Sequence, residues 1–257
     1  MNQEKQNHII HYLKNEIRFD GRKKDEYRKI EVETGVVKTA EGSARVKIGD
    51  TEVMVGIKFE VGKPYPDIPE EGTLMVNTEL IPMCNPEFES GPPSIWSIEL
   101  SRVVDRGIRE SKAIDTRKLC IKAGELVWTV VIDVVPLNDE GNLLDASALA
   151  TILALKDAKF PKLVDDKIDF KAITKDKLPM LAEPISVTVL KIGEHFIVDP
   201  ITNEEKVLDA RLTVATLDDG TICALQKGGE HALSVSDIEK MIDLATKKAK
   251  ELRKYLR

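Results

Sequence analysis

Residues 126–158 read LVWTVVIDVVPLNDEGNLLDASALATILALKDA, and they place two different apolar patterns side by side. Residues 126–135 are almost continuously apolar, which is typical of a strand with both faces covered. Residues 143–158 are rich in alanine and leucine and apolar nearly all round, which predicts a buried helix. The intervening NDEGN predicts a turn. A buried strand followed directly by a buried helix indicates a fold in which sheets and helices share one core.

On the N-terminal side of this stretch, runs of alternating apolar residues predict several strands. A short helix is expected before them, over residues 7–17, from its apolar spacing. Segment 62–72, rich in proline and glycine, predicts a loop. The predicted strands are 29–37, 44–61 (two strands joined at Gly49-Asp50) and 73–83.

On the C-terminal side, residues 159–183 are rich in lysine and aspartate and weakly patterned, so we interpret them as a connection. A last helix is predicted from the capping-box spacing of Ser236 and Glu239. Strands are expected near 184–191, 195–199, 208–216 and 221–227. The whole pattern predicts an α+β fold with helices packed on mixed sheets.

We expect a single domain over residues 1–257, made of two halves. The first half is about 25–158 and the second about 184–257, and each runs from strands to a helix. This order predicts that the halves are built alike, although they share no visible sequence identity.

The composition limits the possible classes of function. The chain of 257 residues has a formal net charge of -6 and a sequence pI of about 5.5, whereas a protein that coats duplex DNA is usually basic. Cys84, Cys120 and Cys223 lie far apart and form no CxxC pair, so we expect neither a zinc site nor a disulfide framework. No metal ion and no cofactor are predicted. The polar N-terminus and the lack of a long apolar run favour a soluble, cytoplasmic protein without a membrane span.

The stretch IELSRVVDRGIRES (98–111) departs from the acidic average, because it holds three arginines. Arg102, Arg106 and Arg109 are spaced by four and then three residues, which places them along one line of a helix. We call them the arginine stripe. The opposite side of the helix is apolar and consists of Leu100, Val103, Val104, Gly107 and Ile108.

Two interpretations of the arginine stripe remain open on pattern alone. It is a solvated face, in which Glu99 pairs with Arg102 and Asp105 pairs with Arg109 at salt-bridge spacing. Alternatively, it binds phosphate oxygens, to which the planar guanidinium group donates forked hydrogen bonds.

Five segments carry a more specific signal: RFDGR (18–22), EGSARVKIGDTEVMVGIK (41–58), PSIWSIELSRVVDRGIRESKAID (93–115), VWTVVIDVVPLNDEGNLLDASALATILAL (127–155) and VDPITNEEKVLDARLTVA (198–215). Together they resemble the RNase PH family of phosphorolytic ribonucleases, and within it the non-catalytic RNase PH-like subunit of the archaeal exosome. The resemblance implies two pseudo-symmetric strand–helix units. It also implies a hexameric ring of three such subunits and three copies of a catalytic paralogue, RNA-binding cap subunits on one face, and single-stranded RNA in the central channel.

Phosphorolysis requires fixed donors for the attacking phosphate and a carboxylate near the leaving oxygen. In catalytic members of the family, the resemblance places those donors in a turn reading Asp-Gly-Gly-Thr/Ser-Arg. The matching turn here is Asp139-Glu140-Gly141-Asn142-Leu143, in which an amide replaces the hydroxyl and leucine replaces the arginine. A buried leucine cannot hold an anion, and the charge of Glu140 would repel one.

The family's carboxylates form a series of three aspartates spaced by six residues. Here Asp199 matches the first, Glu205 replaces the second, and Arg211 reverses the charge of the third. The longer side chain of Glu205 misplaces its carboxylate, which is costly for catalysis. We therefore expect no catalytic residue, and we interpret Glu204 and Glu205 as a solvated acidic loop. The alternative is an active phosphorolytic 3′–5′ exoribonuclease with a divergent site built on Asp199 and Glu205.

The resemblance also bears on the arginine stripe. Arg102 and Arg106 match positions that contact RNA phosphates in the archaeal subunit, where this helix faces the active site of the neighbouring paralogue. We predict Arg102, Arg106 and Arg109 as RNA-binding residues, with Arg109 equally suited to pairing with Asp105. The chain would then support phosphate-dependent 3′–5′ RNA degradation without catalysing it. A spacer that does not touch RNA is the third possibility, and Arg22 is expected to make an ion pair or an interface contact.

Overall fold

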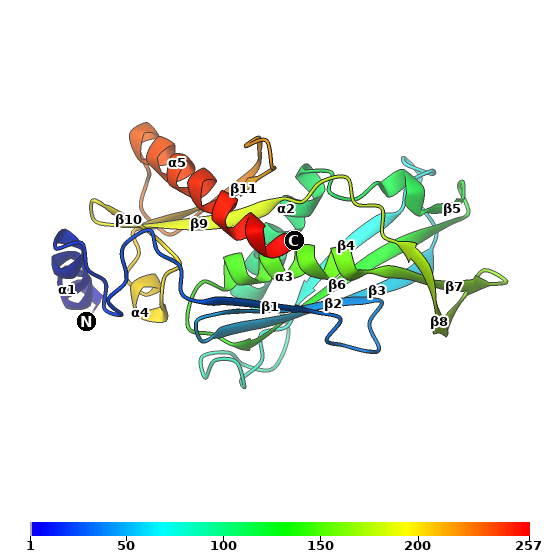
Figure 1. Cartoon of the computed structure of the whole chain (residues 1–257), viewed down its shortest axis with the longest axis horizontal. Helices are drawn as coiled ribbons and strands as arrows, with labels where there is room; N and C mark the ends of the chain where they lie inside the picture. The colour runs from blue at the N-terminus through cyan, green and yellow to red at the C-terminus, as the bar shows by residue number, and fades with distance from the viewer. Residues whose placement is uncertain (1) are drawn as a thin grey trace.

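Two sheets with a helix between them form the body of the protein (Figure 1). The computed structural model describes residues 2–257, apart from the side chains of Asn2 and Gln3. In the larger sheet, β4 runs parallel to β6 and the other neighbouring strands are antiparallel. Its order is β1 (Ile30–Thr34), β2 (Gly42–Ile48), β3 (Thr51–Gly62), β6 (Leu126–Asn138) and β4 (Thr73–Thr78), with β5 (Cys120–Lys122) also paired to β6.

The second sheet is antiparallel throughout and comes from the C-terminal half. A single helical turn, α4 (Thr202–Glu205), connects two of its strands, and α5 (Val235–Leu252) packs on β9 and β11. The order of strands is β10 (His195–Val198), β9 (Ile185–Ile192), β11 (Ala210–Thr216) and β12 (Ile222–Gly228). The strands predicted in both halves are therefore present.

Helix α3 (Leu143–Asp157) lies between the two sheets (Figure 1). It contacts β2 and β3 of the larger sheet and β9 of the smaller one. Every residue from Leu143 to Leu155 is buried. This confirms the helix predicted to be apolar all round, since both of its sides face a sheet.

Helix α2 (Ile95–Glu110) carries the arginine stripe and contacts β4 and β12, one edge strand of each sheet. The helix begins after Ser94, whose hydroxyl accepts a hydrogen bond from the N–H of Ser97 at 3.1 Å. The predicted apolar side is confirmed, because Leu100, Val103, Val104, Gly107 and Ile108 are buried.

Residues 159–183 are not a simple connection, so that prediction was wrong. They contain a hairpin of β7 (Lys159–Val164) and β8 (Lys167–Lys177). Phe160 packs against the core aromatics Phe59 and Trp128, at centroid distances of 4.8 and 5.6 Å. Most lysines and aspartates of the hairpin face solvent. Because they are so many, the alternation of apolar and polar residues that indicates a strand is not visible in the sequence.

The last helix starts earlier than predicted. Ser234, not Ser236, is its N-cap, and the capping box is closed by Asp237 instead of Glu239. The Ser234 hydroxyl accepts from the N–H of Asp237 at 3.1 Å, and the Asp237 carboxylate accepts from the N–H of Ser234 at 3.0 Å. A shorter acidic side chain therefore makes the same reciprocal pair of bonds.

The predicted N-terminal helix is α1 (Asn2–Lys14), displaced toward the start of the chain. Ile9 and Leu13 are buried in a small cluster with Leu190 and Ile197 of the second sheet. Within residues 2–257, none of the helices combines the length and the apolar character needed to cross a membrane.

Candidate functional site

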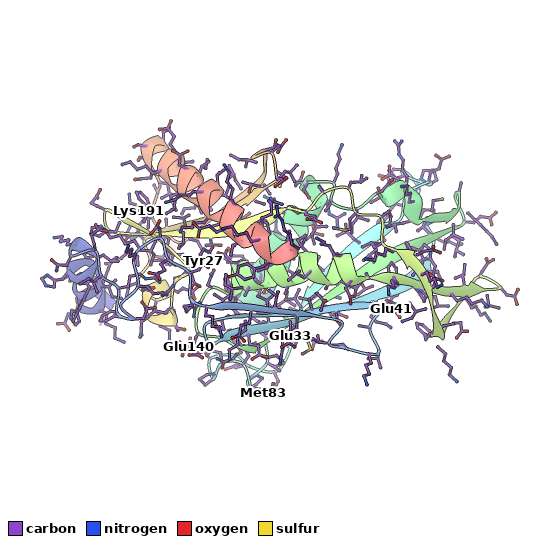
Figure 2. All side chains as sticks on the ribbon, viewed as in Figure 1. Tyr27, Glu33, Glu41, Met83, Glu140 and Lys191 are labelled. Carbon is purple, nitrogen blue, oxygen red and sulfur yellow. The ribbon has the colours of Figure 1, made fainter. Side chains whose placement is uncertain are left out.

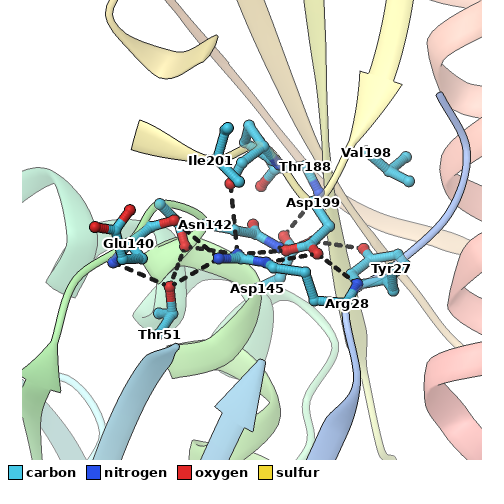
Figure 3. A network of polar contacts seen from close by, with 12 residues as sticks. Tyr27, Arg28, Thr51, Glu140, Asn142, Asp145, Thr188, Val198, Asp199 and Ile201 are labelled. Carbon is cyan, nitrogen blue, oxygen red and sulfur yellow. Dashed lines mark hydrogen bonds and ion pairs between the residues drawn. The ribbon is translucent and has the colours of Figure 1, made fainter. Parts of the chain in front are cut away.

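The carboxylate of Asp199 lies at the centre of a buried polar network (Figure 3). Asp199 is 0% exposed. Its Oδ2 accepts hydrogen bonds from Arg22 Nη1 (2.8 Å), from the Arg28 N–H (2.8 Å) and from Arg28 Nε (2.9 Å). Its Oδ1 accepts from Arg28 Nη2 (2.7 Å) and Asn142 Nδ2 (2.9 Å). These donors saturate both oxygens, so the carboxylate does not fit a role as a magnesium ligand or as an acid facing a substrate.

The turn Asp139–Leu143, expected from the resemblance to correspond to a phosphate-binding turn, is closed by the same network. Arg28 donates to the carbonyl oxygens of Glu140 (2.8 Å) and Gly141 (3.0 Å). A Cβ on Gly141 would lie only 2.5 Å from the carbonyl oxygen of Pro200, so the turn packs directly on the backbone there. Leu143 is buried as expected, at 2% exposure. The guanidinium nearest the turn is thus already engaged by carbonyl and carboxylate oxygens.

Glu204 is buried, so the predicted solvated acidic loop was wrong for this residue. It is 1% exposed and pairs with Arg18, whose Nε donates to Oε1 at 2.9 Å. Arg18 is itself 2% exposed and also donates to the carbonyl oxygens of Val198 and Asp199. The prediction failed because the partner of Glu204 lies at the other end of the sequence.

Glu205 is also not a solvated residue. Its side chain reaches back to the turn, where Oε1 accepts the N–H of Asn142 at 2.9 Å. Burial, together with the negative charge of Asp139, raises the pKa of Glu205 to about 7, although the hydrogen bond from the Asn142 N–H lowers it. Its carboxyl group therefore serves as a backbone acceptor in the turn.

Arg211, at the third position of the carboxylate series, pairs with the helix that carries the arginine stripe. Its Nη2 lies 2.6 Å from Glu99 Oε1, and its guanidinium lies 5.1 Å from the centroid of the Trp96 ring. The expected pairing of Glu99 with Arg102 was therefore wrong, since Glu99 is held by a strand of the second sheet.

The three arginines of the stripe differ in what they contact. Arg102 is exposed, and across residues 2–257 its side chain has no hydrogen bond or ion pair. Arg106 is exposed and makes one long hydrogen bond, 3.4 Å, to Gln226 Oε1 on β12. Arg109 pairs with Asp105 through bonds of 2.8 and 3.1 Å, which confirms that predicted pair. The Arg102 and Arg106 guanidinium groups thus have no carboxylate partner among the described residues, and that of Arg109 is held by a carboxylate.

Sequence reasoning identified part of the buried network and missed the rest. Arg22 forms ion pairs with Asp20 and Asp199, which is one of the two roles expected for it. Arg18 and Arg28 were not singled out, although they hold Glu204 and Asp199. The available signal was three arginines within residues 18–28 of an acidic chain.

Two family models match this chain. The 3′ exoribonuclease family (RNase PH) is matched by its domain 1 over residues 26–161 and by its domain 2 over residues 182–248. The chain belongs to the RNase PH family. The family resemblance drawn from the five sequence segments is confirmed, as is the RNase PH-like α+β fold.

Relatives within the RNase PH family are similar over nearly the whole chain. A protein named exosome complex component Rrp42 from Methanopyrus kandleri is 48% identical, over 93% of this chain and 91% of the relative. A protein of the same name from Methanocella arvoryzae is 50% identical, over 93% of this chain and 90% of the relative.

Solved structures give the same result. A chain of the Archaeoglobus fulgidus exosome with RNA bound to the active site superposes with a TM-score of 0.92, at 45% identity, and covers 100% of this chain and 99% of that one. A chain of an archaeal exosome core gives a TM-score of 0.87 at 42% identity, covering 99% of this chain and 97% of that one.

Proposed function

We propose that this chain is a non-catalytic ring subunit of an archaeal exosome. It binds single-stranded RNA and completes the active site of a catalytic RNase PH-like paralogue, with which it alternates, three plus three, in a hexameric ring carrying RNA-binding cap subunits. It acts in the cytoplasm as a single domain. The names of its relatives and their coverage of the whole chain support this role.

We propose that the chain is not catalytic because the residues at the positions matched to catalytic ones are buried or already paired. Both oxygens of Asp199 are saturated, Leu143 is buried where an arginine would hold phosphate, and Arg211 is paired with Glu99. Among the described residues, Arg22, Arg28 and Arg211 are all engaged by carboxylates, so none of the three is available to an attacking phosphate. Removing Arg28 to admit one would leave Asp199 buried beside fewer donors, which is strongly unfavourable.

The proposal of RNA binding is carried by one observation: Arg102 and Arg106 are exposed on one helix face without a carboxylate partner. Exposed arginines at i,i+4 repel each other unless an anion lies between them. A phosphate oxygen satisfies both, and each charge-assisted contact contributes roughly 1.5–3 kcal/mol. Arg109 contributes less, because a phosphate must compete with Asp105.

One assay distinguishes the proposed non-catalytic role from the alternative, an active phosphorolytic enzyme with a divergent site. The purified chain and its mixture with the catalytic paralogue are incubated with single-stranded RNA and inorganic phosphate, and released nucleoside diphosphates are measured. We expect release by the mixture and none by the chain alone. Release by the chain alone, abolished by Glu205→Gln, would establish the alternative instead.

A further inference from the structure

A groove of about 920 Å³ opens between loop 79–94 and the first turn of α2. Its lining includes the aromatic rings of Phe88 and Trp96 and the hydroxyl-bearing Thr78. Glu79, Glu87 and Glu89 also line it, and no lysine, arginine or histidine does. We call this the acidic groove, defined by these six residues. Its volume is in the range of pockets that enclose a ligand of several hundred daltons.

Contacts outside the groove hold the loop in place. The carbonyl oxygen of Cys84 accepts the N–H of Asp139 at 3.1 Å, and Asn85 Nδ2 donates to Asp139 Oδ2 at 3.0 Å. Figure 2 shows Met83, in this loop, and Glu140, in the turn, at the same edge of the molecule. These two bonds tie the loop of the groove to the Asp139–Leu143 turn.

The acidic groove carries uncompensated negative charge. Glu79 and Glu89 are exposed, and their carboxylates have no hydrogen bond or ion pair with any residue from 2 to 257. Glu87 shares its charge with Lys206 at 2.7 Å, but both of those side chains are about half exposed, so the pair is weak. A cationic group is the occupant that this charge favours, and a nucleic-acid phosphate is disfavoured.

A buried hydroxyl in the lining of the groove also lacks a partner among the described residues. Thr78 is 8% exposed, and its Oγ1 has no hydrogen bond among the described residues. A buried hydroxyl without a partner costs about 1–3 kcal/mol, so such groups in folded proteins usually find one. This oxygen is itself enclosed, so an occupant of the groove could bond it only if the Thr78 side chain rotated outward.

The chain already holds one guanidinium in this neighbourhood. Arg211 lies over the ring of Trp96 and pairs with Glu99, so this one guanidinium contacts both an aromatic ring and a carboxylate. The acidic groove offers the same combination in Phe88 and Trp96 with Glu79 and Glu89. Arginine suits it better than lysine, because its planar head stacks on rings and is less strongly hydrated.

We propose that the acidic groove docks an arginine-bearing segment of a partner protein. Ile95, between two lining residues, is 88% exposed, and Met83 of the same loop is 71% exposed. Apolar side chains exposed beside a charged groove are typical of a protein contact surface. The segment would place a guanidinium between Glu79 and Glu89 and lay its apolar residues on Ile95 and Met83.

The test uses the full chain with Trp128→Phe, so that Trp96 is the sole tryptophan and its fluorescence reports on the groove. The probe is an acetylated and amidated octapeptide of alternating glycine and arginine, compared with the same peptide carrying neutral citrulline. We expect saturable binding of the arginine peptide only. Glu79→Gln with Glu89→Gln should weaken it at least about tenfold, since two charge-assisted contacts are lost.

Glu194→Gln with Glu230→Gln is the matched control, because it removes the same charge from two exposed glutamates outside the groove. This control should change the affinity by less than about threefold, through long-range charge alone. Equal binding of the citrulline peptide, or equal losses in the two double variants, would overturn the proposal. So would a saturable change in Trp96 fluorescence on titration with an oligoadenylate in the absence of the peptide, which would assign the groove to RNA. None of these readouts depends on RNA degradation, so the exosome role stands or fails separately.

Discussion

Arg211 Nη2 lies 2.6 Å from Glu99 Oε1, and this ion pair joins the degenerate carboxylate series to the arginine stripe. Glu99 is three residues before Arg102, a spacing at which the two would otherwise pair on the helix surface. By holding Glu99, Arg211 leaves Arg102 unpaired. Arg211, which stands where the resemblance predicts an aspartate in catalytic members, thus keeps Glu99 away from Arg102.

We expect Arg211→Ala to weaken RNA binding by the mixed ring by about twofold, because the freed Glu99 pairs with Arg102. The double variant Glu99→Gln with Arg211→Ala should regain the original affinity, since no carboxylate remains to compete. Fluorescence anisotropy with a labelled single-stranded RNA measures both. If the double variant binds as weakly as the single one, Glu99 is not the mediator.

Loss of the stripe itself has a larger expected effect. Arg102→Ala with Arg106→Ala should weaken RNA binding by the mixed ring at least roughly tenfold, because two charge-assisted contacts are removed. The slope of log affinity against log salt should fall by about 1.4, or 0.7 for each lost phosphate contact. Arg117→Ala with Lys118→Ala removes the same charge from two exposed residues nearby and should leave the slope unchanged. An unaltered slope in the stripe variant would favour a spacer role.

Asp199→Asn is expected to destabilise the folded chain by about 3–5 kcal/mol, because it leaves the partly buried Arg22 and Arg28 without their shared carboxylate. Urea denaturation followed by circular dichroism measures the change in the free energy of unfolding. Asp20→Asn, which removes the more exposed partner of Arg22, should cost no more than about 1 kcal/mol. Similar losses in the two variants would contradict the central role given to Asp199.

Gly141→Ala tests the close packing of the turn on the backbone at Pro200. Its cost should exceed that of Gly220→Ala by about 1–3 kcal/mol, the usual penalty of overpacking. Both glycines have a positive φ, 88° and 87°, but a Cβ on Gly220 would meet nothing within 4 Å. The two variants therefore share the backbone strain and differ in the clash. Thermal and urea unfolding measure the loss of stability in each variant. Equal losses in the two variants would show that the turn moves aside to accommodate the Cβ.

Asp145 predicts a specific dependence of stability on pH. Burial raises the pKa of Asp145 to about 7, from an ordinary value of 3.8, although Tyr27 and Thr188 donate hydrogen bonds to its carboxyl group. Between those two values the folded chain keeps a proton that the unfolded chain has released. The Asp145 contribution to the free energy of unfolding therefore falls as pH rises from about 4 to about 7, by at most about 1.4 kcal/mol per pH unit.

Asp145→Asn removes that titration while keeping an oxygen that can accept the Thr188 N–H. We expect its free energy of unfolding to fall less steeply between pH 4 and 7 than that of the unaltered chain. Urea titrations at several pH values compare the two slopes. Parallel profiles would show that Asp145 is ionised in the folded protein throughout this range.

Helices and strands with a clear pattern of apolar residues could be predicted from sequence. The apolar run of β6, the all-round apolar α3 and the two-sided α2 each carry a pattern that a single local environment explains. The hairpin of β7 and β8 could not be predicted, because its solvent-facing lysines and aspartates outnumber the residues that pack on the core. Local pattern is a poor guide where most side chains of a strand face water.

The candidate site likewise contains some contacts that the sequence could predict and others that it could not. The arginine stripe follows from helical spacing, and so did the pairing of Arg109 with Asp105. The partners of Asp199, Glu204 and Glu99 could not be predicted, since each ion pair spans more than a hundred residues of sequence. Such pairs depend on how the two sheets meet, which no local window contains.

The saturation of Asp199 limits the routes by which this chain could evolve. A Leu143→Arg change would insert a cation into the hydrophobic core, and loss of Arg28 would leave the buried Asp199 with fewer donors. Each single step toward a reopened pocket passes through a less stable protein. The network around Asp199 therefore resists stepwise change, because a pocket open to an anion would require several simultaneous substitutions.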